Sequence, residues 1–324
     1  MSSQQILGSD RQYDISVVIP LFNEEKNIDL LYDKLKVALD KINRRYQIIM
    51  VDDGSTDKTL SVLKEIHQRD KTLRVISFRR NFGQAAALSA GFDWAKGDIV
   101  IAMDGDLQNH PEDIPLLLRK IEEGYDVVSG WRVERKDPFL TRRLPSSVAN
   151  FIISWVSKVK LHDYGCTLKA YRKEVVDNLR LYGEMHRFIP ALASLMGASV
   201  AEVKVKHSPR THGKSKYNLF RTIRVILDLF TVKFFLSFAT RPIQIFGLIG
   251  IFSSLVGFIL AVYLSVKKIF FGHSLADRPL LLLAILLILM GVQFITMGLL
   301  GEMLARTYYE TQKKPPYLIK EVLD

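Results

Sequence analysis

The sequence has a single cysteine and two long stretches without charge, and each absence is informative. Cys166 is the single cysteine in 324 residues, which excludes an intrachain disulfide and favours a reducing compartment. Residues 243–266 and 280–301 contain no Asp, Glu, Lys or Arg. A helix needs ~20 apolar residues to cross the core of a bilayer, so both stretches are predicted to be transmembrane helices.

The positive charge is strong but is not arranged for binding nucleic acid. The formal net charge is +11, yet the sequence has no basic helix and no aromatic stacking motif, so we expect no nucleic-acid partner. The charge fits a protein that lies on an anionic lipid bilayer. The uncharged stretches lack the intramembrane charges that mark a transport pathway, which argues against a transporter. Glycines in them permit close helix packing and predict a homo-oligomer: Gly247, Gly250, Gly291, Gly298 and Gly301.

The sequence divides where its composition changes. Residues 1–217 alternate strand and helix patterns with scattered charges and are predicted to form an α/β domain. Residues 218–242 are typical of a juxtamembrane amphipathic helix, 243–304 of a two-helix membrane anchor, and 305–324 of a tail. No signal peptide is expected, because polar residues interrupt any apolar run near residue 1. The predicted location is the cell inner (cytoplasmic) membrane, multi-pass, with domain and tail in the cytoplasm.

Two carboxylates one residue apart follow an apolar run in the segment Val100–Gln108. The run predicts a buried strand, and Gly105 allows a turn that points Asp104 and Asp106 into one crevice. Hard cations such as Mg²⁺ and Mn²⁺ prefer oxygen ligands and often bridge to substrate phosphates. The spacing therefore suits a divalent metal at a strand end. The alternative is a solvated Asp-Gly turn.

Two further predicted strands also end in polar residues. Residues 46–51 lead into Asp52 and Asp53, and residues 15–19 lead into Pro20–Glu25. In open α/β sheets, ligands bind outside the carboxyl ends of the strands. We therefore expect the three strand ends to face the same crevice.

These turns and three further segments occur in a characteristic order. The segments are residues 18–24, 51–55, 80–83, 104–108, 129–132 and 210–217. Together they resemble the inverting glycosyltransferases of family 2, which have a Rossmann-like GT-A fold and use nucleotide-sugar donors. More narrowly, the chain resembles the polyprenyl-phosphate glycosyltransferases, the group that contains dolichol-phosphate mannose synthase and the bactoprenol glucosyltransferases.

The resemblance implies a role for individual residues. It places a metal ion, Mg²⁺ or Mn²⁺, on Asp106 and Gln108 together with Asp104. It places the donor against Pro20, Phe22, Glu24, Val51, Asp53, Asn81, Asp104 and Arg132. It assigns the acceptor and the diphosphate to Arg132, Arg210, Lys214 and Lys216, whose cationic groups suit phosphate.

The residues expected to be catalytic are Asp104, Asp106 and Asp163. The first two would hold the metal that stabilises the departing diphosphate. Asp163 could act as a base or orient the acceptor phosphate, and the alternative is a loop acid that caps a turn. A thiol nucleophile at Cys166 is not expected, because no motif places a base near it.

The implied reaction is inverting transfer of a hexose, with glucose from UDP-glucose and undecaprenyl phosphate favoured. The first alternative is a mannosyltransferase that uses GDP-mannose. The second is a non-catalytic, membrane-anchored protein that binds nucleotide sugars. A processive polysaccharide synthase is disfavoured, because the sequence lacks the Gln-x-x-Arg-Trp motif and further spans.

Overall fold

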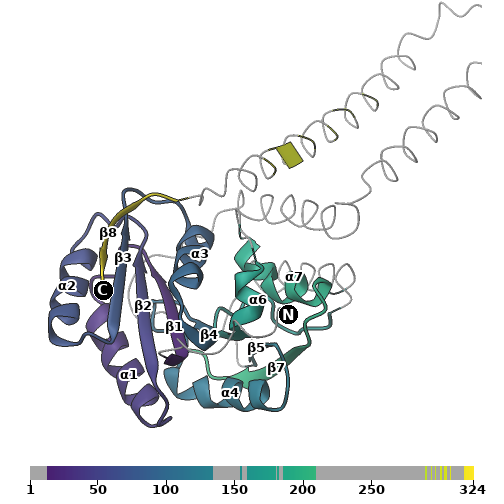
Figure 1. Ribbon diagram of the computed structural model, residues 1–324, viewed down its shortest axis with the longest axis horizontal. Helices are drawn as coiled ribbons and strands as arrows, with labels where there is room; N and C mark the ends of the chain where they lie inside the picture. Colours follow the sequence, from purple (N-terminus) through teal and green to yellow (C-terminus); the bar gives the residue numbers. More distant parts are fainter. Residues whose placement is uncertain are drawn as a thin grey trace, which may run out of the picture. The chain divides into compact units, whose positions relative to one another are not determined.

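A mixed sheet of eight strands lies at the centre of the part of the chain that the structure describes (Figure 1). The computed structural model describes residues 13–133, 159–179, 181, 185–208 and 317–324, together with residues 154, 289, 293, 296, 300, 303, 304 and 307. The strands are β1 (Tyr13–Leu21), β2 (Tyr46–Asp52), β3 (Leu73–Phe78), β4 (Gly97–Ala102), β5 (Val127–Arg132), β6 (Lys169–Arg172), β7 (Val200–Val205) and β8 (Ile319–Leu323).

Helices connect most of these strands. The α-helices are α1 (Ile28–Asp40), α2 (Thr59–Arg69), α3 (Gln84–Trp94), α4 (Ile114–Glu122), α6 (Lys173–Asp177) and α7 (Ile189–Leu195), and the short 3-10 helices are η1 (Pro111–Asp113) and η3 (Met185–Phe188). Helix α3 packs on β1 and β2, and α4 packs on β5 and β6. The α3 residues that face the sheet are small, with Ala87 and Ala90 fully buried, which allows a close approach.

The strand order is β7-β5-β6-β4-β1-β2-β3-β8. Strands β4, β1, β2 and β3 are parallel neighbours, whereas β6 runs antiparallel to both β4 and β5. The chain passes from β1 outward to β2 and β3 and then returns to place β4 on the other side of β1. The order of strands therefore reverses between β1 and β4, which is where an open α/β sheet binds its ligand.

Apolar side chains on the parallel strands explain why these segments form the middle of the sheet. Ile15, Val17 and Ile19 of β1 pack with Ile48 and Met50 of β2 in the main core. Such nearly continuous apolar runs are typical of strands that are covered on both faces. The predicted GT-A-like α/β fold is confirmed, with an antiparallel component that the sequence pattern did not predict.

The last strand, β8, lies at the edge of the sheet and runs antiparallel to β3 (Figure 1). The prediction of a separate tail at 305–324 did not anticipate this strand. The segment 319–323 is short and includes charged side chains. From the sequence alone, such a segment is expected to be an exposed loop or tail. The strand forms because it pairs with backbone N–H and C=O groups of β3, which would be unpaired if β3 were the edge of the sheet.

Within the described residues, no helix is both long and apolar enough to cross a bilayer. The predicted spans 243–266 and 280–301 and the amphipathic segment 218–242 lie wholly or almost wholly outside those residues. They remain predictions.

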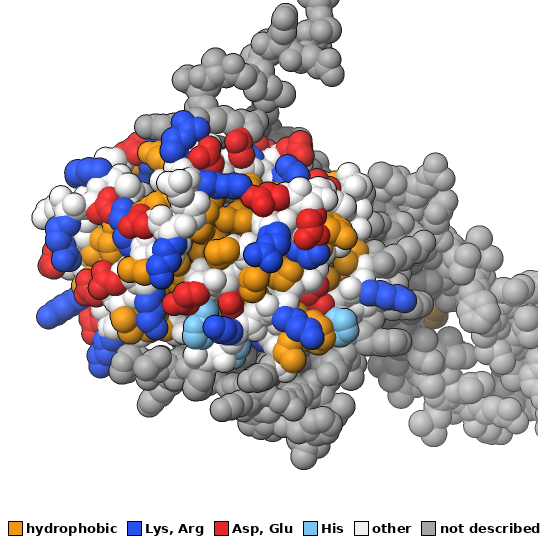
Figure 2. All heavy atoms as spheres, turned by 90° about the horizontal axis from the view of Figure 1, so that it is seen from below, with side chains coloured by type: hydrophobic (Ala, Val, Ile, Leu, Met, Phe, Trp, Pro, Cys, Tyr) orange, Lys and Arg blue, Asp and Glu red, His pale blue; other side chains and the backbone are white. Residues whose placement is uncertain are grey.

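Charge on the visible face of the described part is mixed. Figure 2 shows basic and acidic side chains interspersed around apolar ones, with no broad patch of one sign on that face. The excess of positive charge in the whole sequence is thus not gathered there into a single basic surface.

Candidate active site

The acidic turns after β2 and β4 flank the end of β1. In the sheet register, Leu21 lies beside Asp52 and Val18 lies beside Ala102. Backbone hydrogen bonds continue past the strands, because Asp53 N–H donates to the Leu21 carbonyl at 2.8 Å and Met103 N–H to the Val18 carbonyl at 3.1 Å. The expectation that the three strand ends share one edge of the sheet is confirmed.

The turn after β4 holds two carboxylates close together. Asp106 is 5% exposed and accepts the Gln108 backbone N–H at 3.1 Å, while Leu107 between them adopts a positive φ of 62°. Burial raises the pKa of Asp104 to about 6, and the neighbouring Asp106 carboxylate adds to the shift. Both effects disfavour the charged form of Asp104.

The donor atoms of this turn fit a hard divalent cation. Asp104 and Asp106 supply carboxylate oxygens, and the Gln108 side chain donates from its amide nitrogen to the Ser208 carbonyl at 3.4 Å. Among the described residues, no group of three or more His, Cys, Asp or Glu side chains could hold a metal. A cation here would need oxygens from Gln108, water or a substrate phosphate, which is usual for Mg²⁺ and Mn²⁺.

Three consecutive residues link the two acidic turns. The backbone N–H groups of Phe82 and Gly83 donate to the two oxygens of Asp53, at 2.7 and 2.9 Å. The next side chain, Gln84, donates to Asp104 Oδ1 at 2.7 Å. The segment 82–84, which we call the bridge, therefore sets the distance and orientation between the turn after β2 and the turn after β4.

Asp52 and Asp53 have different partners. Asp52 accepts hydrogen bonds from Ser55 N–H at 3.0 Å and from the Ser77 hydroxyl at 2.8 Å, so it supports the turn. Asp53 is held by the bridge. A carboxylate has about four lone-pair sites, so these contacts are compatible with the predicted hydrogen bond that Asp53 accepts from an N–H of the nucleotide base.

The segment after β1 is tied to the turn after β2. Asn23 adopts a positive φ of 57°, and its N–H donates to Ser55 Oγ at 2.9 Å. Glu24 N–H donates to Thr59 Oγ1 at 2.9 Å. Pro20, Phe22, Glu24, Val51 and Asp53 thus belong to one structural unit, while Asn81 is exposed on the loop before the bridge. Their contact with a donor remains a prediction.

Arg132 and Asp163, which were assigned separate roles, form a buried ion pair. The guanidinium donates to both carboxylate oxygens, from Nε at 2.6 Å and from an Nη at 2.9 Å. The side chains are 13% and 3% exposed. Burial acts against the charge of Arg132, but the hydrogen bonds to Asp163 dominate and raise its pKa. Asp163 therefore fixes the orientation of the Arg132 guanidinium. This cation lies close enough to Asp104 to affect the pKa of Asp104.

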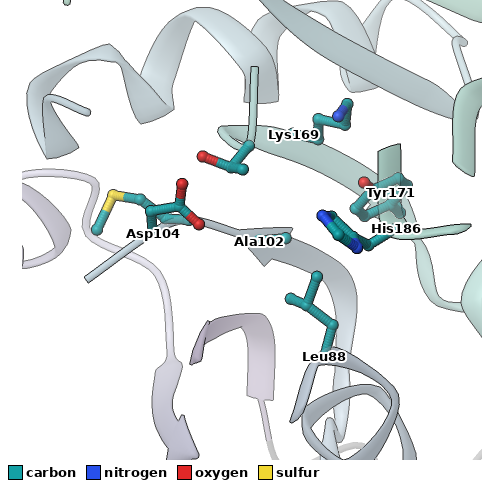
Figure 3. Close-up of a pocket in the computed structure, with 8 residues that line it drawn as sticks. Leu88, Ala102, Asp104, Lys169, Tyr171 and His186 are labelled. Carbon is teal, nitrogen blue, oxygen red and sulfur yellow. The ribbon is translucent and has the colours of Figure 1, made fainter. Parts of the chain in front are cut away.

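A pocket beside Asp104 contains residues that the sequence analysis did not select. Figure 3 shows Asp104 after β4, Lys169 and Tyr171 on β6, and His186 lining this pocket. Burial lowers the pKa of Lys169 to about 8, and its ammonium donates to the Tyr164 and Cys166 carbonyls. The sequence does contain a signal for Lys169, which is a lysine inside the apolar run 168–171. An unpaired lysine is rarely buried, so a lysine in a predicted buried strand indicates a special role.

Cys166 has no nucleophilic character in this structure. It is fully buried, and burial raises the pKa of its thiol to about 11. The thiolate is the nucleophilic form of cysteine, so this agrees with the expectation from the sequence.

The basic segment 209–217 lies outside the described residues, and with it Arg210, Lys214 and Lys216. The residues just before it are described. Ser208 N–H donates to the Gln108 carbonyl at 3.0 Å, and His207 forms a bridge with Asn109. The chain therefore enters the basic segment beside the acidic turn that follows β4.

Comparison with known proteins identifies the family. The sequence profile "Glycosyl transferase family 2" matches residues 16–180, which include most of β1, all of β2 to β6 and both acidic turns. The chain is 42% identical, over 96% of its length and 93% of the relative's, to a dodecaprenyl-phosphate galacturonate synthase of Rhizobium johnstonii. It is 39% identical, over 95% of its length and 90% of the relative's, to an undecaprenyl-phosphate 4-deoxy-4-formamido-L-arabinose transferase of Pseudomonas aeruginosa.

Solved structures share the fold of this sheet and its helices. A solved structure with this fold is glucosyl-3-phosphoglycerate synthase from Mycobacterium tuberculosis with Mn²⁺ and UDP-glucose, at a TM-score of 0.54, 22% identity, 68% of this chain and 79% of that chain. The chain belongs to glycosyltransferase family 2, in the group of the polyprenyl-phosphate sugar transferases.

Proposed function

We propose that this protein transfers a sugar, with inversion, from a nucleoside diphosphate to polyprenyl phosphate at the cytoplasmic face of a membrane. The observation that carries the proposal is the bridge, which joins Asp53 to Asp104 at the point where the strand order reverses. Support for the acceptor comes from the relatives, whose names include dodecaprenyl and undecaprenyl phosphate.

In the proposed reaction, an acceptor phosphate oxygen attacks the anomeric carbon while the bond from that carbon to the diphosphate breaks. The second ionisation of a phosphate monoester lies near pH ~6, so the attacking oxygen is already anionic and needs no strong base. A divalent cation bound at Asp104 and Asp106 would neutralise charge on the departing diphosphate. Arg132, held by Asp163, brings positive charge toward the two phosphate groups, and Arg210, Lys214 and Lys216 add to it.

The described residues also support the proposed topology. Because β8 pairs with β3 in one sheet, residues before 209 and after 316 lie on the same side of any membrane that the chain crosses. An even number of crossings satisfies this condition, as the two predicted spans do. The pairing puts both parts on one side, and we place that side in the cytoplasm, where nucleotide sugars are made.

The identity of the transferred sugar is the most specific part of the proposal. The resemblance favoured glucose from UDP-glucose, with GDP-mannose as the alternative. The names of the two relatives add galacturonate and 4-deoxy-4-formamido-L-arabinose as further candidates. Hexose discrimination depends on a few hydroxyl contacts, so a donor panel decides it.

The test uses membranes that carry the full chain, undecaprenyl phosphate, Mn²⁺ or Mg²⁺, and labelled nucleotide sugars. The panel contains UDP-glucose, UDP-galacturonate, GDP-mannose and a UDP-linked formamido-arabinose. Thin-layer chromatography should show one lipid-linked sugar that requires the metal. Binding of a donor without any lipid product would favour the non-catalytic nucleotide-sugar binder instead.

A further inference from the structure

We propose that residues 317–323, which are β8 and the two residues before it, position the donor site, and that Tyr317 is the residue through which they do so. The inference rests on the proposed function, because the site in question is the one for the nucleotide sugar. Tyr317 is a positioning residue, since it contacts the supports of the site and not the site itself.

Tyr317 holds two elements at once. Its side chain is 5% exposed, and its ring stacks on Phe78, with centroids 5.0 Å apart and planes 13° from parallel. Its hydroxyl donates to Asp93 Oδ2 at 2.8 Å. Phe78 is the last residue of β3, and Asp93 lies near the end of α3. Tyr317 therefore fixes the strand that enters the loop 79–83 and the helix that leaves it.

The contacts continue from Tyr317 to the bridge. Phe78 meets Phe82 edge to face, with centroids 5.7 Å apart. The N–H of Phe82 is the group that donates to Asp53 at 2.7 Å. Beside Tyr317, the Leu318 carbonyl accepts the Arg79 N–H at 3.1 Å. Side-chain and main-chain contacts from residues 317 and 318 both lead to the segment that connects the two acidic turns.

The loop before the bridge needs such support. Residues 79–81 are exposed and belong to no strand or helix, so holding them in one conformation costs conformational entropy. A binding site gains affinity when its supports are ordered before the ligand arrives. Tyr317 supplies that order from the segment just before β8, which follows the predicted membrane anchor in the chain.

β8 and Asp324, the residue after it, are held by side-chain contacts that do not reach the bridge. Glu321 pairs with Lys64 of α2 at 2.8 Å, and Asp324 accepts a hydrogen bond from Arg74 Nε at 2.8 Å. Glu321→Gln therefore weakens the strand without touching the loop 79–83. It is a matched control for substitutions of Tyr317.

The first measurement is hydrogen–deuterium exchange of the full chain in detergent. We expect faster exchange of the peptide that covers residues 79–84 in Tyr317→Ala, whereas Glu321→Gln should leave it as in the wild type. Tyr317→Phe, which keeps the ring over Phe78, should recover most of the protection. Unchanged exchange at residues 79–84 in Tyr317→Ala overturns the inference, whatever the substrate proves to be.

The second measurement is binding of UDP and of GDP, each with Mn²⁺. Tyr317→Ala should lower the affinity for the nucleotide that the wild type binds by about fivefold to tenfold, in line with loss of one aromatic pair. The KM for undecaprenyl phosphate should not change. If the variant bound the nucleotide and undecaprenyl phosphate more weakly to the same degree, a role specific to the donor would be contradicted. If the wild type binds neither nucleotide, the proposed function fails, and exchange at residues 79–84 still decides whether Tyr317 orders the bridge.

Discussion

At the scale of single residues, the buried pair of Arg132 and Asp163 should contribute strongly to stability. Removal of one partner leaves a buried charge without its ion-pair partner, in a place that water reaches poorly. Asp163→Leu should lower the free energy of unfolding by about 3 kcal/mol. Combined with Arg132→Met, the loss should be smaller than the sum of the two single losses, because the double variant buries no lone charge.

Urea unfolding of the detergent-solubilised protein, followed by tryptophan fluorescence, measures this coupling. Additive losses would show that the two side chains do not interact in solution. The same variants should lose sugar transfer, since the cation next to Asp104 is either missing or no longer oriented.

At the scale of elements, Asp70 ties α1 to the turn between α2 and β3. It accepts hydrogen bonds from Tyr32 at 2.5 Å and from Thr72 N–H at 2.8 Å, and it pairs with Lys36 at 2.8 Å. Burial alone would raise the pKa of Asp70, but these partners lower it well below its ordinary value. The stabilisation is fully present above the ordinary aspartate pKa and is lost as the pH falls below it.

Asp70→Asn should therefore cost about 1 kcal/mol at neutral pH, after allowance for the partial exposure of the pair. The difference from the wild type should shrink as the pH falls below about 4. Thermal unfolding from pH 7 to pH 3 gives the comparison. A difference that is constant over this range would exclude the carboxylate as its source.

The contact between the turn after β2 and the loop 79–83 depends on Gly54. Its φ is +66°, and a Cβ there would lie 2.4 Å from the Arg80 backbone carbon. Gly54→Ala should separate the two segments and weaken nucleotide binding by about tenfold or more. Gly124 also has a positive φ, at +105°, but open space around it, so Gly124→Ala carries the strain without the collision.

Calorimetry with the nucleotide that the wild type binds separates the two effects. We expect lower stability in both variants and a loss of nucleotide affinity in Gly54→Ala alone. Equal nucleotide affinity in the two variants would show that the close approach of Gly54 to Arg80 does not shape the donor site.

At the scale of the whole molecule, the sequence predicted the parallel centre of the sheet because its strands are apolar runs that end in acids. Such local patterns also located Asp53, Asp104 and Asp106 at one edge. The strand β8 was not predictable in this way, because its pairing with β3 joins residues about 240 positions apart. The same holds for the pairing of Arg132 with Asp163, which depends on how β5 meets a later loop.

The shared sheet leads to a prediction of topology. Cys166 is buried and its thiol has a raised pKa, so single cysteines can be labelled against a silent background. Lys58→Cys and Lys320→Cys are at exposed positions, on either side of the predicted spans. Both should react with a membrane-impermeant maleimide in inverted vesicles, and neither in intact cells. Labelling from opposite sides would contradict the pairing of β8 with β3.

The most direct test of the central claim is metal-dependent transfer to undecaprenyl phosphate by Asp106→Asn. Asp98→Asn is the matched control, since Asp98 is an exposed acid at the opposite end of β4. The account predicts that Asp106→Asn lowers transfer by about 100-fold or more with the fold intact, that Asp98→Asn matches the wild type, and that chelation stops both active proteins. Full transfer by Asp106→Asn, or transfer that persists in the chelator, would contradict it.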